Sequence, residues 1–188
     1  MQKSFVAMAS LLLGLSVAHS ASAADIFLLN VPGIAGEVTL KGYEGWISVT
    51  AFSAGFTNSD NRGAGGGAEA GRTSCQELRV VKMLDITSPE VAAAVASAHH
   101  YSNVKLAVLK EGAEQNPEFL RFTLSNAIFT SVTFGGSTQT SAVADVTTTA
   151  QVETLALRAN HISMQFVPQT AKGSAGTPVT SVVDCSTR

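Results

Sequence analysis

Three histidines and four acidic residues are the side chains of this chain that could support acid–base or metal chemistry. The histidines are His99, His100 and His161, and their candidate partners are Asp85, Asp145, Glu153 and Asp184. They form no H-x-x-x-H or H-E-x-x-H spacing, and no Cys-x-x-Cys pair or G-x-S-x-G elbow occurs. The sequence therefore predicts no catalytic residue, no cofactor and no metal site. His99 and His100 suit a simpler role at the C-terminal end of a helix.

A glycine-rich segment at residues 58–72 is the second feature that could bind a ligand. Gly63, Gly65, Gly66 and Gly67 resemble a phosphate-binding loop, but the Gly-Lys-Ser/Thr ending is missing and a strand-like stretch follows. We therefore interpret the segment as a long loop between two strands. Loops of this length inside a compact domain are uncommon and are usually functional or disordered.

The chain has two cysteines, Cys75 and Cys185. In an exported protein a disulfide between them is the first expectation, because the compartment is oxidising. It would close a loop of about 110 residues and stabilise the fold by roughly 2–4 kcal/mol in the chain-entropy account. The alternative is a pair of buried free thiols.

Export is indicated by residues 1–23. Lys3 gives a positive start, residues 5–17 form an apolar core, and Ala21-Ser22-Ala23 is an A-x-A cleavage site, with Ala24 first in the mature chain. The apolar core is shorter than the roughly 20 residues that span a bilayer, so no membrane insertion is predicted. The alternatives are a retained N-terminal anchor or a misassigned start codon.

Cleavage would leave 165 of the 188 residues, the size of one domain at residues 24–188. The formal net charge of the whole chain is −2, and loss of Lys3 makes it −3. The charges are scattered, so they predict no binding to nucleic acid or to an anionic membrane surface.

The elements that would position these residues are mainly strands. Alternating or continuous apolar runs bounded by turn residues predict strands at 26–31, 46–56, 76–84, 103–110, 118–126, 127–134, 148–157, 159–167 and 178–183, with breaks at 112–117, 135–141 and 172–177. One short helix is predicted, with Ser88 as N-cap, Pro89 as first helical residue and small apolar residues at 91–98. Such a helix buries little area, so we expect it to cover one side of a β structure.

In order along the chain, several segments resemble the haemolysin-coregulated protein (Hcp) family, the tube-forming subunits of type VI secretion systems. These segments are DIFLLNVPGIAGE, KGYEGWISVTAFSAGF, the glycine-rich loop, Thr87-Ser88-Pro89 before the helix, His100-Tyr101 after it, VKLAVLKEG, EFLRFTLSNAIFTSV as a hairpin, Gly135-Gly136-Ser137, and Phe166-Val167-Pro168-Gln169. No single segment is diagnostic, but their order and spacing are specific. The resemblance covers nearly the whole mature chain.

This resemblance implies a mainly β fold, in which two packed antiparallel sheets form a β-barrel with one short α-helix on its flank. It also implies a structural protein and not an enzyme, with hexameric rings that stack into a tube and hold effector or other secretion-system proteins in the lumen. The ring-stacking loop would include Asn58, Asp60, Arg62, Gly65, Gly66, Gly67 and Arg72.

The leader separates this chain from the family pattern, because tube subunits are loaded from the cytoplasm. We therefore expect an exported Hcp-like protein that assembles in the periplasm or outside the cell. One alternative is an exported monomeric binding or adhesion module without a role in a contractile machine. Another is a hydrolase that uses His99 or His100.

Overall fold

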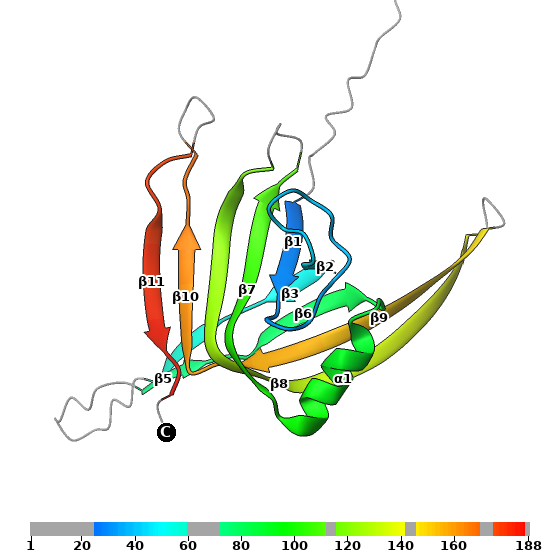
Figure 1. The fold of residues 1–188 in the computed structure, drawn as a ribbon, viewed down its shortest axis with the longest axis horizontal. Helices are drawn as coiled ribbons and strands as arrows, with labels where there is room; N and C mark the ends of the chain where they lie inside the picture. The colour runs from blue at the N-terminus through cyan, green and yellow to red at the C-terminus, as the bar shows by residue number, and fades with distance from the viewer. Residues whose placement is uncertain (1–24, 60–71, 112–115, 142–145, 170–174, 187–188) are drawn as a thin grey trace, which may run out of the picture.

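The strands of this protein form one large curled sheet and a separate small hairpin (Figure 1). The computed structural model describes residues 25–59, 72–111, 116–141, 146–169 and 175–186. The leader at residues 1–23 and its cleavage site Ala23-Ala24 lie outside this part of the chain. The elements are β1 (Asp25–Asn30), β2 (Ile47–Val49), β3 (Ala51–Ser53), β4 (Phe56–Ser59), β5 (Arg72–Cys75), β6 (Leu78–Met83), α1 (Ser88–Ser97), β7 (His100–Lys110), β8 (Glu118–Ser141), β9 (Val146–Arg158), β10 (His161–Phe166) and β11 (Val179–Asp184).

The large sheet is antiparallel and returns upon itself. Its nine strands include the path β2-β1-β7-β8-β9-β6-β3, and β10 adds to β8 and carries β11. The two ends of the path, β2 and β3, are consecutive pieces of chain separated only by Thr50. The backbone N–H of Thr50 donates to the carbonyl of Val81 on β6 at 2.8 Å. The predicted mainly β, barrel-like architecture with one helix is therefore confirmed. The two ends of the sheet are joined at Thr50, where the chain passes from β2 to β3.

The longest strand, β8, differs from the prediction made from the sequence. The stretch EFLRFTLSNAIFTSV was expected to be a hairpin, with a break at residues 135–141, but it is one strand from Glu118 to Ser141. Asn126 has a φ of 52°, a conformation that Asn adopts more readily than most residues. It bends the strand instead of reversing it. Before the bend, Ser125 pairs with His161 of β10, and after it, Ile128 pairs with Arg158 of β9.

Side chains from all sides of the barrel meet in its interior. Leu29, Val80, Leu124 and Leu155 have no exposed surface, and they come from β1, β6, β8 and β9. Aromatic rings extend this core: Phe52 of β3 contacts Phe27 and Phe122 edge to face, with ring centroids 5.3 and 6.0 Å apart. Each fully buried large apolar side chain stabilises the fold by about 1.5–3 kcal/mol relative to an exposed one.

A second apolar layer lies on the outer face of β1 and β7. Leu28, Ala107 and Leu109 point away from the main core and are covered by residues 38–46, including Tyr43 and Trp46. This covering segment is held by its own backbone hydrogen bonds, such as Gly36 N–H to Gly45 O at 2.8 Å. The strand at 26–31 is apolar on both parities because both of its faces are buried.

A polar contact fixes the covering segment to the start of β8. The Tyr43 hydroxyl donates to Glu118 Oε2 at 2.6 Å, and Arg121 Nη2 donates to the same oxygen at 2.5 Å. Burial is the main cause that raises the pKa of Tyr43 to about 12, and the hydrogen bond and charge of Glu118 raise it further. The hydrogen bond that Arg121 donates to Glu118 is the main cause that raises the pKa of Arg121.

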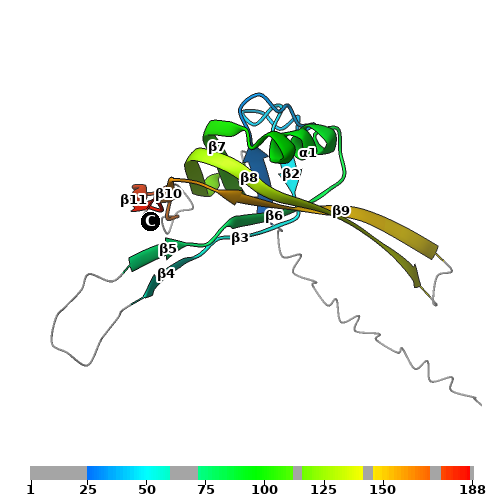
Figure 2. The ribbon, with the colours of Figure 1, turned by 90° about the horizontal axis from the view of Figure 1, so that it is seen from below.

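Helix α1 covers the barrel next to β8 (Figure 2) and buries Val91 and Ala94. Its N-cap is Thr87, so the expected cap at Ser88 is wrong. Ser88 is instead buried, and its Oγ accepts a hydrogen bond from the Asp85 N–H at 3.1 Å. Asp85 Oδ1 accepts from both the N–H and the hydroxyl of Thr87, at 2.8 and 2.6 Å. These side chains therefore fix the turn before the helix, and no side-chain hydrogen bond caps the helix itself.

A buried charge cluster joins this turn to the barrel. The side chains of Lys82 on β6 and Glu153 on β9 have 0% exposure, and Lys82 Nζ lies 2.6 Å from Glu153 Oε1. Lys82 Nζ also lies 2.8 Å from Asp85 Oδ1. Burial raises the pKa of Asp85, but the hydrogen bonds of Lys82 and Thr87 outweigh this effect and lower it below its ordinary value. Lys82 therefore holds two strands and the start of α1 together.

We predict that Lys82→Met lowers the free energy of unfolding by about 3–5 kcal/mol, because Glu153 is left buried without its cation. The double variant Lys82→Met/Glu153→Leu should recover most of this loss. Urea denaturation of the three proteins measures both effects. Equal losses in the single and double variants would contradict the account.

We also predict that Tyr43 releases its proton near pH 12 in the folded protein. The folded state holds this proton more tightly than the unfolded chain, whose tyrosine pKa is about 10. The contribution of Tyr43 to stability is therefore complete below pH 10 and is lost as the pH rises to about 12. Phenolate absorbance in a Tyr101→Phe background measures the titration. Adding Glu118→Gln should lower the Tyr43 pKa, and an unchanged titration would argue against the Glu118 contact.

Candidate assembly surface

The histidines do not form a catalytic site. His100 and His161 lie on opposite sides of β8, opposite Ile128 and Ser125 respectively. His100 Nδ1 lies 2.9 Å from Asn126 Oδ1, and the rings of His99 and Tyr101 meet edge to face with their centroids 4.7 Å apart.

The acidic residues are also dispersed. Asp184 makes an exposed contact of 3.7 Å with His161, whereas Asp85 and Glu153 are engaged by Lys82. Asp145 lies outside the described residues. No cluster of three potential metal ligands occurs in the part of the chain that the structure describes.

An open groove of about 430 Å³ lies beside His99, between α1 and the turn at residues 32–34. Glu90, Ser97 and Tyr101 also line it. The Ser97 hydroxyl donates to the Ala93 carbonyl of its own helix at 2.9 Å, so it is not positioned by a histidine as a nucleophile. Burial, followed by the charge of Glu90, raises the pKa of Tyr101. The groove therefore lacks the nucleophile–base pair that the hydrolase alternative requires.

The predicted glycine-rich loop connects the two strands of the β4–β5 hairpin. This hairpin is a separate two-stranded sheet, and Figure 2 shows it projecting from one side of the barrel, away from the end of the β8–β9 hairpin. Among the predicted stacking residues, Asn58 lies on β4 opposite Thr73, and Arg72 begins β5 opposite Ser59. The others, Asp60, Arg62, Gly65, Gly66 and Gly67, lie outside the described residues.

The β4–β5 hairpin has few contacts of its own with the barrel. Its strands contact each other extensively, and neither strand shares comparable contacts with another element. Phe56 is 39% exposed and Asn58 is exposed. An isolated two-stranded hairpin is marginally stable at best in water. The base of the hairpin therefore needs support from elsewhere.

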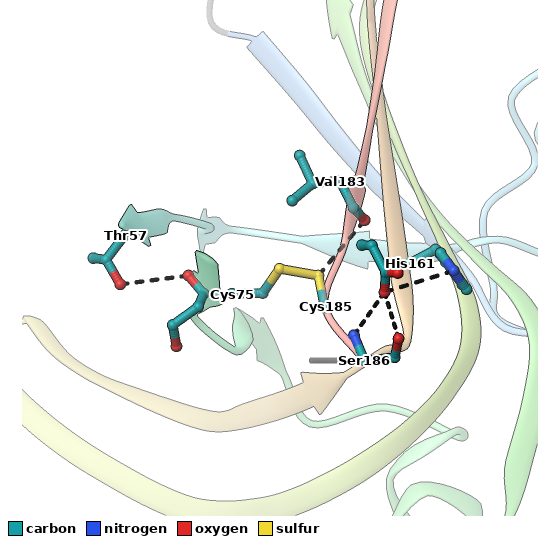
Figure 3. Close-up of a disulfide and its surroundings, with 8 residues drawn as sticks. Thr57, Cys75, His161, Val183, Cys185 and Ser186 are labelled. Carbon is teal, nitrogen blue, oxygen red and sulfur yellow. Dashed lines mark hydrogen bonds and ion pairs between the residues drawn. A yellow bond between two sulfur atoms is a disulfide. The ribbon is translucent and has the colours of Figure 1, made fainter. Parts of the chain in front are cut away.

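The disulfide supplies this support (Figure 3). Cys75 at the end of β5 is bonded to Cys185, which follows β11, with 5.4 Å between their Cα atoms. Both cysteines are half-buried and pack against the main core. The backbone N–H of Cys185 donates to the Asn160 carbonyl at 2.7 Å. The predicted pairing is therefore present, and it ties the base of the β4–β5 hairpin to the C-terminal hairpin.

Strand β11 forms an exposed edge. It pairs only with β10 among the described strands, and Val179 and Val182 are 66% and 65% exposed. Met164 and Phe166 of β10 are also exposed. An unpaired edge with exposed apolar residues can pair with another chain, and patches of this kind mark protein–protein contacts.

A second apolar group lies at the end of β6, where Met83, Leu84 and Ile86 are exposed. The sequence analysis missed both groups. A sequence signal exists for the β11 group. Val179 and Val182 lie an odd number of residues apart, so they point to opposite faces of the strand, and apolar residues on both faces indicate that both faces are covered. In the described part of the chain, no helix is long and apolar enough to cross a membrane.

Comparisons with known proteins agree with this geometry. A family model described as "Type VI secretion system effector, Hcp" matches residues 28–166. Hcp1 of Pseudomonas aeruginosa is 31% identical over 158 residues, which cover 84% of this chain and 92% of that protein.

Solved structures share the fold. A type six secretion system protein has a TM-score of 0.74 at 21% identity, covering 86% of this chain and 96% of the other. Hcp1 of Salmonella typhimurium has a TM-score of 0.63 at 22% identity, covering 86% and 95%.

We predict that Cys75→Ser lowers the free energy of unfolding by roughly 2–4 kcal/mol, because the unfolded chain gains the freedom of a large loop. Thermal melting of the oxidised wild type and the variant, each with and without reductant, measures this effect. Reductant should lower the melting temperature of the wild type alone. Equal melting of the wild type in both conditions would contradict the prediction.

Proposed function

This chain belongs to the Hcp family of type VI secretion proteins, and we propose that its copies close into hexameric rings that build a tube. Membership of this family identifies the chain as an Hcp-like tube subunit. Hcp proteins are structural and not enzymes, which agrees with the absence of catalytic motifs from the sequence. The hexamer, the stacking of rings and the cargo are proposals.

The observation that carries ring formation is the pair of exposed apolar groups on different elements. One includes Val179 and Val182 on the edge strand β11, and the other includes Met83 and Ile86 after β6. A contact between two different surfaces of identical chains is head-to-tail, and such contacts form a closed ring when the rotation permits it. A ring would cover the β11 edge, which a solitary monomer leaves open to aggregation.

The β4–β5 hairpin is the candidate for contacts between rings. It projects from the barrel, and its glycine-rich connection contains the stacking candidates between Asn58 and Arg72. Fixing the backbone of a segment on contact costs about 1–2 kcal/mol per residue. Because of this cost, stacking would require several hairpins of each ring to bind at the same time. The lumen would hold effector or other secretion-system proteins.

We further propose that the chain acts after export, in the periplasm or outside the cell. The A-x-A leader at residues 1–23 and the Cys75–Cys185 disulfide support this location, since disulfides persist in oxidising compartments. Fractionation of the native strain tests it. Mature protein in the periplasm or medium is expected, and mature protein found only in the cytosol would contradict export.

We predict that Val182→Lys abolishes ring formation, because it places a charge on the apolar edge that a neighbour would cover. Val182 is 65% exposed in one chain, so the fold should tolerate the lysine. The control is Val182→Thr, which keeps a β-branched side chain of similar size and should retain rings. Sedimentation velocity measures assembly, and circular dichroism measures folding.

Wild-type protein that sediments as a monomer at all concentrations would contradict ring formation and favour the monomeric binding module. Wild-type assembly that persists unchanged in Val182→Lys would instead place the contact elsewhere.

A further inference from the structure

The β4–β5 hairpin joins the barrel through an irregular neck. On the barrel side, Ser53 pairs with Arg79 of β6, and on the hairpin side, Phe56 pairs with Cys75. The strand that leads into β6 has one more residue across this gap than its partner, so the pairing changes register there. Extra residues of this kind disrupt a ladder and bend the strand.

Few interactions cross the neck. The backbone hydrogen bond from Gln76 N–H to Gly55 O, at 2.9 Å, bridges the gap between the two ladders. A Cβ on Gly55 would lie 2.7 Å from Gln76 Oε1, so a bulkier residue would displace that side chain. A register change beside a glycine is a place where a hairpin can pivot.

The disulfide is a second attachment directly beside the neck. Cys75 is the residue of β5 closest to the gap, and its partner Cys185 is held by the Asn160 carbonyl. The Asn160 N–H in turn donates to the Ser125 carbonyl of β8 at 3.1 Å. The disulfide therefore adds a covalent attachment of the β4–β5 hairpin beside the neck (Figure 3).

We propose that the Cys75–Cys185 disulfide is a redox switch that sets the direction of the β4–β5 hairpin, so that rings stack only when it is oxidised. This proposal rests on the proposed function of the hairpin in stacking. Fixing a binding segment in its bound direction increases affinity by removing the cost of ordering it. Because several hairpins of one ring engage together, the effect on stacking multiplies.

The chemistry is thiol–disulfide exchange. The two cysteine thiols lose two protons and two electrons as the bond between their sulfur atoms forms, and a disulfide reagent such as oxidised glutathione accepts them and becomes two thiols. A phosphine reverses the step by accepting oxygen from water as the protein disulfide gains two hydrogens. The cytoplasm keeps such cysteines reduced, so stacking would begin only after the chain reaches an oxidising compartment.

The test compares the processed protein in its oxidised form with the same protein treated with a water-soluble phosphine. A Cys75→Ser/Cys185→Ser double variant, with and without phosphine, controls for other effects of the reagent. Negative-stain electron microscopy over a concentration series distinguishes single rings from stacks. Hydrogen exchange is measured in the same samples for the amides of β4 and β5 and, as a report on the fold, for those of β7 and β8.

The expected result is single rings in both redox states, with stacks only in the oxidised protein or at about tenfold lower protein concentration than in the reduced protein. Reduction should open β4 and β5 to fast exchange, whereas β7 and β8 should stay protected, apart from the acceleration that the lower global stability causes. The double variant should behave like the reduced protein in both buffers.

Equal stacking, or equal exchange in β4 and β5, would overturn the switch. Complete loss of protection in β7 and β8 would also overturn it, because the disulfide would then be required for the barrel to fold at all. If neither form makes rings, the proposed function fails. The exchange data then decide whether the disulfide sets the hairpin, and equal exchange rejects that part too.

Discussion

Main-chain pairing along β8 is the interaction on which the rest of the molecule depends. The strand bonds to β7 along one edge from Glu118 to Ile128, and its other edge bonds to β10 before Asn126 and to β9 beyond it. One bend in one strand therefore turns the sheet, and the closure at Thr50 completes the turn. The interior then receives side chains from opposite walls, and the exterior of β1 and β7 is left to be covered by residues 38–46. The family fold follows from this single continuous strand.

The same pairing leaves backbone groups without partners at the periphery. Among the described strands, the outer edge of β11 has no strand partner and β4 and β5 pair with each other in a separate sheet, and both lie beside the Cys75–Cys185 bond. The stable barrel thus has two peripheral features, the β11 edge and the β4–β5 hairpin, that few other parts of the same chain support. In the proposed assembly, contacts between copies would cover both, the β11 edge by ring closure and the β4–β5 hairpin by stacking.

Local patterns predicted most of the strands, the helix and the disulfide, but not the continuous strand β8, the β4–β5 hairpin or the connections that depend on distant residues. Asn is common in turns, and only the pairing of the residues on either side of Asn126 with two different strands shows that it forms a bend. Lys82 lies on the same parity as Leu78 and Val80, and its burial depends on Glu153 and Asp85, which are distant from each other in sequence. The apolar residues of β11 indicated a strand, whereas their exposure became visible only in the fold. The family resemblance supplied what these patterns could not, because it rests on the order of many segments.

The central claim is that this chain is a ring-forming subunit, and negative-stain electron microscopy of the oxidised mature protein tests it most directly. The account predicts rings with sixfold symmetry, some of them stacked end to end. Uniform particles of the size of one chain, at every concentration that sedimentation velocity can sample, would contradict it.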